Sequence, residues 1–328
     1  MRRRDFIKRI AGLAFAWPLA ARAQQAGKLP TIGFLGSNAS AWRPWTDAFA
    51  GRLRELGWIE GRTIAIEYRW AEGRSERFAE IAAEFVRLKV DVIVTSGTPP
   101  VLAAKQATSV IPIVFAAAGD PVGTGLVASV ARPGGNVTGL SLQQTDTAGK
   151  RLELLREVVP GLRRLAIMAN SDNLATVLDM REAQAAARAL GLDVVTSDIR
   201  RPEDIAPAFE ALKERVDALY VSGDQILNTN RMRVAVLALG ARLPTMYSIR
   251  EHIETGGLMY YGPNLADLYR RSADFVDRIL QGTKPGDIPV EQPTRFDLVI
   301  NLTTAKALGL TIPEPFLVRA DVPSSTLP

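Results

Sequence analysis

The stretch from Asp91 to Ser141 constrains the fold more than any other part of this 328-residue chain. Two short apolar runs, Val92–Val94 and Ile111–Phe115, consist of consecutive apolar residues that do not alternate with polar ones. That pattern is typical of parallel strands that are covered on both faces. The alanine-rich stretch between them, Pro100–Thr108, has the length of a crossover helix. The stretch therefore predicts a strand-helix-strand unit of an open α/β sheet.

The rest of the chain predicts two successive series of β-α units, with a boundary near Asn136–Thr145. Further strands of the first series are expected at Thr31–Leu35, Thr63–Trp70 and Asn136–Leu142. Strands of the second series are expected at Arg164–Ala169, Asp193–Ser197, Ala218–Val221 and Thr245–Tyr247. A helix is also expected at Val122–Ala131. The predicted fold class is α/β, with two doubly wound, Rossmann-like lobes.

The C-terminal part predicts a chain that returns to the first lobe and crosses back. It contains a strand at Gly257–Gly262, an amphipathic helix at Leu265–Leu280 and a strand at Phe296–Asn301. We therefore expect an N-terminal lobe of residues 28–140 plus 263–288, and a C-terminal lobe of residues 141–262 plus 289–322. Several crossings between lobes form a hinge, which suits closure of a cleft around a ligand.

The N-terminus has the pattern of a cleaved export signal. Arg3-Arg4-Asp5-Phe6-Ile7-Lys8 matches the twin-arginine pattern, and Ala21-Arg22-Ala23 matches a cleavage site. The apolar run Ile10–Leu19 has about half of the roughly 20 residues that a membrane span needs. We therefore expect a signal peptide over residues 1–23, cleavage near Ala23 and a periplasmic protein. No later run predicts a membrane span.

Removal of this signal changes the charge balance. The chain has 40 basic and 35 acidic residues, and the signal carries six basic residues and one acidic one. The remaining 34 basic and 34 acidic residues give a net charge of zero, so the basic excess that drives nucleic-acid binding is missing. The chain has no cysteine, which excludes disulfides, thiolate metal sites and a lipid-modified cysteine. We expect a free, monomeric protein with a small-molecule ligand.

Small or polar residues follow the predicted strands, where open α/β sheets bind ligands. We predict that ten of them bind the ligand: Ser37, Asn38, Ser96, Gly97, Thr98, Asp120, Ser141, Asn170, Asp224 and Tyr247.

Their chemistry suggests separate roles within the cleft. Ser96, Gly97 and Thr98 precede or begin a helix, where hydroxyl and N–H groups can hold an anionic group. Asp224, or Asp120, can balance a cation. For each single residue, capping of the next helix is an equally good explanation. Trp42, Trp45 and Tyr247 can stack on an aromatic or apolar ligand, or can be ordinary packing.

Other motifs give little support for catalysis. Gly123-Thr124-Gly125-Leu126-Val127-Ala128 matches a dinucleotide-binding pattern only formally, because it does not follow the strand directly. No phosphate-binding loop and no G-x-S-x-G elbow is present. The single histidine, His252, lies among Arg250, Glu251 and Glu254 and is expected at a partly solvated helix position. We predict no metal, no cofactor and no catalytic residue.

Several runs together carry a resemblance to a known family. They are Leu56–Arg62, Ala103–Thr108, Ile111–Phe115, Gly119–Val127, Ala131–Gly139, Tyr260–Asn264, Leu298–Leu302 and Ala305–Leu310. On these residues the chain resembles the ABC transporter substrate-binding protein family that includes tryptophan- and tyrosine-binding proteins. The resemblance covers nearly all of Lys28–Ala320 and implies a type I periplasmic binding protein fold. It also implies capture of a small solute, such as an amino acid or related carboxylate, and delivery to a membrane permease with its ATPase.

Two other functions remain open on the same two-lobed scaffold. An exported enzyme would need a nucleophile or an acid-base pair, and the sequence shows no motif for one. A ligand-sensing subunit would share the whole cleft, and only its partner would separate it from a transport protein.

Overall fold

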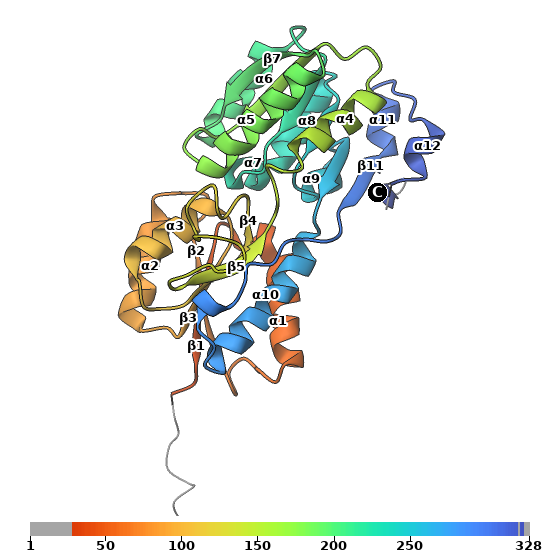
Figure 1. Ribbon diagram of the computed structural model, residues 1–328. Helices are drawn as coiled ribbons and strands as arrows, with labels where there is room; N and C mark the ends of the chain where they lie inside the picture. The colour runs from red at the N-terminus through yellow and green to blue at the C-terminus, as the bar shows by residue number, and fades with distance from the viewer. Residues whose placement is uncertain (1–27, 321, 325–328) are drawn as a thin grey trace, which may run out of the picture.

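The computed structural model describes residues 28–320 and 322–324, which form two α/β lobes (Figure 1). The two predicted lobes with parallel sheets are confirmed, although the second sheet is mixed. The predicted signal peptide lies outside the described residues.

The first lobe is built on a five-stranded parallel sheet in the order β2-β1-β3-β4-β5. Its strands are β1 (Thr31–Gly36), β2 (Ala65–Trp70), β3 (Val92–Thr95), β4 (Ile113–Ala118) and β5 (Val137–Ser141). Its first helices are α1 (Ala39–Glu55), α2 (Arg77–Leu88) and α3 (Thr98–Ala107). Every residue of β3 and β4 is buried, as their unbroken apolar runs predict, because helices cover both faces of the sheet.

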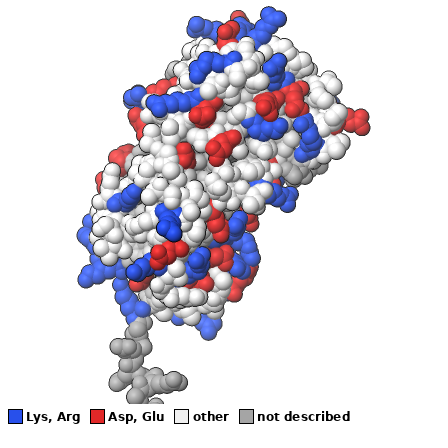
Figure 2. Space-filling view, viewed as in Figure 1, with Lys and Arg blue, Asp and Glu red and all other residues white. Residues whose placement is uncertain are grey.

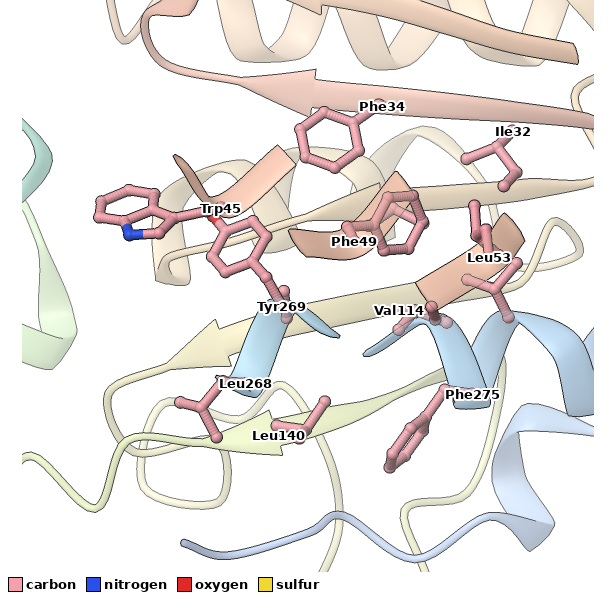
Figure 3. Close-up of a cluster of buried hydrophobic side chains, with 14 of the residues drawn as sticks. Ile32, Phe34, Trp45, Phe49, Leu53, Val114, Leu140, Leu268, Tyr269 and Phe275 are labelled. Carbon is pink, nitrogen blue, oxygen red and sulfur yellow. The ribbon is translucent and has the colours of Figure 1, made fainter. Parts of the chain in front are cut away.

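Helix α10 (Leu265–Leu280) comes late in the sequence but completes the first lobe. Its buried residues join those of α1 and β1 in one apolar cluster, which includes Phe34, Phe49, Tyr269 and Phe275. Figure 3 shows these side chains between the helices and the sheet. Burial of one such aromatic side chain contributes about 1.5–3 kcal/mol. This packing ties the returning segment to the first lobe.

The second lobe has a seven-stranded sheet in the order β12-β11-β10-β9-β8-β6-β7, in which only β10 and β11 pair antiparallel among the described strands. Its strands are β6 (Arg164–Ala169), β7 (Asp193–Asp198), β8 (Ala218–Val221), β9 (Thr245–Tyr247), β10 (Met259–Gly262), β11 (Asp297–Asn301) and β12 (Val322–Ser324). Its helices are α4 (Ala148–Val158), α5 (Leu174–Ala189), α6 (Ile205–Leu212), α7 (Gln225–Thr229), α8 (Arg231–Gly240), α9 (Glu251–Glu254), α11 (Leu302–Ala307) and α12 (Glu314–Leu317), with 3-10 turns at Pro202–Asp204 and, in the first lobe, Pro285–Asp287.

The chain crosses between the lobes along neighbouring segments (Figure 1). After β5, the Ser141 N–H donates to Glu291 O at 2.8 Å, and the Glu291 N–H donates to Gly139 O at 3.0 Å. Two crossing segments that both run from the first lobe to the second are therefore hydrogen-bonded to each other in parallel. A few residues absorb any rotation of one lobe against the other, which is the geometry of a hinge.

Two local predictions are wrong. Residues 121–131 form turns and bends, because glycines interrupt the segment and Asp120 Oδ1 accepts the Gly123 N–H at 2.8 Å. His252 is buried, with 2% of its surface exposed, and its ring stacks on Tyr247 at 4.3 Å between centroids. Within the short helix α9, Glu254 is exposed, whereas His252 and Ile253 pack inward.

Figure 2 shows acidic and basic residues interspersed over the visible face of both lobes. Within the described ranges, no helix is both long enough and apolar enough to cross a membrane.

Candidate functional site

A cavity lies between the lobes, where the strand ends of both sheets meet. The first lobe contributes Trp42, Trp45, Ser96, Gly97, Thr98, Ala117, Gly119, Leu265 and Tyr269, and the second lobe and the crossing contribute Leu142, Gln144, Asn173, Ala175, Gly223, Asp224, Gln225, Asn228 and Ile249. Its free volume of about 60 Å³ is several times the 10–15 Å³ that one water needs. It can therefore hold part of a small molecule even with the lobes in this close arrangement.

Three buried polar atoms without a hydrogen-bond partner distinguish this cavity. They are Thr98 Oγ1, Asn228 Oδ1 and Tyr269 Oη. Larger hollows of about 420 and 850 Å³ lie elsewhere on the protein. Among the described residues, none that lines either hollow has a buried polar side-chain atom without a hydrogen-bond partner. A buried polar atom without a partner costs about 1–3 kcal/mol. Three in one cavity are explained if a polar ligand satisfies them.

Helix α3 begins at the cavity with an unusual first turn. Its N-cap is Gly97, and Thr98 is followed by Pro99 and Pro100, which have no N–H. Of these three helical residues, only Thr98 can offer a backbone N–H and a hydroxyl to a ligand. The Ser96 hydroxyl already donates to Ala117 O at 3.1 Å. An anionic group would therefore depend mainly on Thr98.

Asp224 is the buried carboxylate of the cavity. It caps α7, because Oδ1 accepts the Ile226 N–H at 2.8 Å. Oδ2 accepts from Asn170 Nδ2 at 3.2 Å and from Asn173 Nδ2 at 3.0 Å. Burial raises the pKa of this carboxyl, and these hydrogen bonds oppose the rise. The Leu227 N–H also faces this carboxylate, so Asp224 can attract a cationic ligand group mainly through its negative charge.

Aromatic rings form the opposite wall. Trp45 stacks on Tyr269 at 5.5 Å between centroids and 26° between planes, and Trp42 lies 5.7 Å from Trp45. Figure 3 shows Trp45 and Tyr269 together at one end of the apolar cluster. With Leu142 and Ile249, these rings provide an apolar surface beside the polar groups. Such a wall suits a ligand with a flat apolar part.

Gln144 connects the cavity to a buried polar network of the second lobe. Its Nε2 donates to Ser222 Oγ at 3.1 Å and to Asp179 Oδ2 at 3.3 Å. Arg151 is 1% exposed, and its Nη1 lies 3.7 Å from Asp179 Oδ1 and donates to Gln144 O at 3.1 Å. Tyr220 Oη accepts from Arg151 and donates to Asp179. This network fixes one wall of the cavity.

The lobes approach each other closely around the cavity. Gln225 Nε2 of the second lobe donates to Ser96 O of the first at 2.8 Å. A Cβ atom added to Gly119 would lie only 2.9 Å from Ala175 Cβ. Contacts this short require the lobes to be closed.

Gly97→Ala is expected to weaken ligand binding about tenfold and to lower the free energy of unfolding by about 1–3 kcal/mol. Gly97 has φ of 84°, and an added Cβ would lie 2.7 Å from Gln225 Nε2. Backbone strain lowers stability, and the clash with Gln225 hinders closure. Calorimetric titration and urea unfolding measure the two effects.

Gly125→Ala is the matched control, because Gly125 has φ of 72° but no atom within 4 Å of an added Cβ. It should lower stability and leave affinity unchanged. Equal loss of affinity in both variants would contradict the closure explanation.

The structure brings only part of the predicted site together. Ser96, Gly97, Thr98 and Asp224 line the cavity, and Asn170 supports Asp224 from behind.

The other five predicted residues lie elsewhere. Asn38 caps α1 by accepting the Ala41 N–H at 3.0 Å, and Asp120 caps a turn. Ser37 is buried at the end of β1, and Ser141 Oγ accepts the Gln143 N–H at 3.0 Å. Tyr247 is fully buried against His252. For these residues, local capping or core packing explains the side chain.

Sequence reasoning missed several polar residues of the cavity. Asn173 is the N-cap of α5, and Gln225 and Asn228 lie in the first turn of α7, so a search of the helix starts that follow strand ends would have found them. Gln144 and Tyr269 give no local signal, because the hinge and the return of α10 bring them to the cavity. Among the residues that the structure describes, no group of three acidic or histidine side chains can hold a metal.

Comparisons with known proteins agree with this architecture. The family model described as ABC transporter substrate binding protein matches residues 44–323. The chain is 29% identical over 262 residues to a tyrosine-binding protein of Clostridioides difficile, with 80% of this chain and 75% of the relative covered.

Solved structures extend the comparison to conformation. An ABC domain in complex with L-Trp from Streptococcus pneumonia has a TM-score of 0.85 at 27% identity, covering 90% of this chain and 99% of its own. A ligand-free, open substrate-binding protein from Clostridium difficile has a TM-score of 0.64 at 28% identity, covering 87% and 97%. At nearly equal identity, this chain is more similar in shape to the ligand-bound structure.

Proposed function

Because this chain belongs to the ABC transporter substrate-binding protein family, with a type I periplasmic binding protein fold, we propose that it captures an amino acid with an aromatic side chain. The ligand lies between the lobes, and closure buries it. The observation that carries this proposal is the cavity with one buried carboxylate, unpartnered polar atoms and an aromatic wall.

The polar ends of an amino acid match the two sides of the cavity. The ammonium group lies at Asp224, which is already held by Asn170 and Asn173. The carboxylate lies at Thr98, where the hydroxyl has no other partner and the backbone N–H begins α3. Asn228 Oδ1 and Tyr269 Oη give the ligand one acceptor and one more hydroxyl.

The aromatic wall supports the choice of side chain. Trp42, Trp45 and Tyr269 offer ring faces, and Leu142 and Ile249 add aliphatic surface. The tyrosine-binding relative and the L-Trp complex support the same class of ligand. Offset or edge-to-face contacts with a bound ring add about 0.5–1.5 kcal/mol each beyond area burial.

We further propose the transport setting of this protein. It is exported by the twin-arginine route, is cleaved near Ala23 and works in the periplasm as a monomer. It delivers its ligand unchanged to a membrane permease with its ATPase. Its lobes comprise residues 28–140 plus 263–288 and residues 141–262 plus 289–322; the apolar clusters support this division except at Val290, which packs in the first lobe.

Calorimetric titration with L-tryptophan and L-tyrosine tests this function. We expect one molecule bound per chain. Tryptamine lacks the carboxylate and indole-3-propionate lacks the ammonium group, so each should bind at least about 100-fold more weakly than L-tryptophan, which corresponds to about 2.7 kcal/mol. Absence of binding by the folded protein, or equal binding of the analogues, would overturn the proposal.

A further inference from the structure

Glu251 joins the two lobes behind the aromatic wall of the cavity. Trp45 belongs to α1 of the first lobe, and its Nε1–H donates to Glu251 Oε1 of α9 in the second lobe at 2.7 Å. Glu251 itself does not line the cavity, whereas Trp45 does. The bond therefore lies one layer behind the ligand surface.

The surroundings of Glu251 make this bond unusual. Its Oε2 is buried and has no hydrogen-bond partner. The charged or titratable groups that face it are Arg231 of α8, Glu254 and His252 of α9, Tyr260 of β10 and Tyr269 of α10. Burial raises the pKa of Glu251 to about 6, while its own backbone N–H, the bond from Trp45 and the charge of Arg231 oppose the rise. A glutamate in a costly position beside a lobe boundary needs an explanation.

The orientation of Trp45 provides one. Its ring is stacked on Tyr269 and touches Trp42, so its plane defines the aromatic wall. An indole has a single hydrogen-bond donor, and a fixed partner for Nε1 fixes the rotation of the ring. Among the described residues, the hydrogen-bond partner of Nε1 comes from the opposite lobe, so this bond fixes the ring only when the lobes are closed.

We propose that Glu251 is a positioning residue that holds the Trp45 indole against the ligand when the lobes close. This role rests on the proposed function, because it acts on the wall that receives the ligand's ring. Closure and orientation of the aromatic wall thereby become one event.

Nuclear magnetic resonance of the tryptophan indoles, recorded on isotope-labelled protein saturated with unlabelled L-tryptophan, tests the contact in the closed protein. The chain has five tryptophans, so the indole region is simple, and Trp45→Phe assigns the resonance. The Trp45 indole proton should move upfield as the pH falls through about 6, because a protonated Glu251 is a weaker acceptor. In Glu251→Gln the resonance should not titrate. His252, the single histidine, does not interfere, because burial and Arg231 lower its pKa to about 3.

Calorimetry with L-tryptophan tests the positioning role. Glu251→Leu should weaken binding about tenfold, and Glu251→Gln, which keeps an acceptor, should stay within about threefold of the wild type. In a protein that already carries Trp45→Phe, Glu251→Leu should weaken L-tryptophan binding by less than a further factor of about two. Glu254→Leu on the same helix is the control and should have little effect, because Glu254 is exposed.

The two arms separate failure of the contact from failure of the proposed function. If the folded wild type binds neither L-tryptophan nor L-tyrosine, the proposed function fails and the positioning role fails with it. If binding is normal but the Trp45 resonance ignores Glu251, the contact is wrong. Equal effects of Glu251→Leu with and without the Trp45 indole would overturn the positioning role.

Discussion

Asp224→Asn is expected to weaken L-tryptophan binding by about 100-fold, or about 2.7 kcal/mol. The Asp224 carboxylate is 4% exposed and is the one acidic group among the residues that line the cavity. Its replacement removes the charge that balances the ligand's ammonium group. The carboxylate accepts hydrogen bonds from Asn170, Asn173 and the Ile226 backbone N–H. In the variant, an amide N–H₂ group replaces one carboxylate oxygen and faces some of these donors without being able to accept from them.

Asp120→Asn is the matched control, because Asp120 also follows a strand but caps a turn outside the cavity. It should leave the affinity for L-tryptophan within about twofold of the wild type.

The pH dependence of binding gives a second readout. Since burial raises the pKa of Asp224, wild-type affinity should fall as acidification protonates this carboxylate. Asp224→Asn should lose that component, and equal affinities of the two variants would contradict the assignment.

Arg151→Met is expected to lower the free energy of unfolding by about 3–5 kcal/mol. Both Arg151 and Asp179 are fully buried, and the substitution leaves the Asp179 carboxylate without its counter-charge. It also removes the donors to Tyr261 O at 2.8 Å and to Gln144 O. Urea unfolding measures the loss, and weaker ligand binding should accompany it because Gln144 forms part of the cavity wall.

The loss in free energy of unfolding caused by Arg151→Met should become smaller as the pH falls. Burial already raises the pKa of Asp179, and loss of Arg151 raises it further, so the folded variant takes up a proton at a higher pH than the unfolded chain. Arg164→Met, which breaks the exposed Arg164–Asp217 pair, is the control and should change stability little. A small, pH-independent effect at Arg151 would contradict the account.

The fold could be predicted from the sequence where one physical cause dominates. The apolar runs of β3 and β4 are buried on both faces, and the amphipathic pattern of α10 matches its packing against α1. The segment after Asp120 could not be predicted in this way. Its apolar residues suggested a helix, but the Asp120 cap and positive φ at Gly125 favour turns.

The sequence could predict residues of the cavity only where backbone topology decides their position. Parallel strands place their carboxyl ends at one edge of each sheet, and the two lobes turn the edges that carry Ser96 and Asp224 toward each other. Tyr269 reaches the cavity through a returning helix, and the Arg151–Asp179 pair joins residues of two helices. Such tertiary pairings leave no local pattern in a single sequence. For Asn38 and Asp120, capping explains the same polar residue types.

The distance between the lobes, measured with and without L-tryptophan, tests the central claim most directly. The chain has no cysteine, so Glu80→Cys in the first lobe and Glu203→Cys in the second give two spin-label sites at exposed positions. Electron paramagnetic resonance should show a long or broad distance distribution in the free protein and a shorter, narrow one with saturating L-tryptophan. An unchanged distribution would contradict closure around an amino acid.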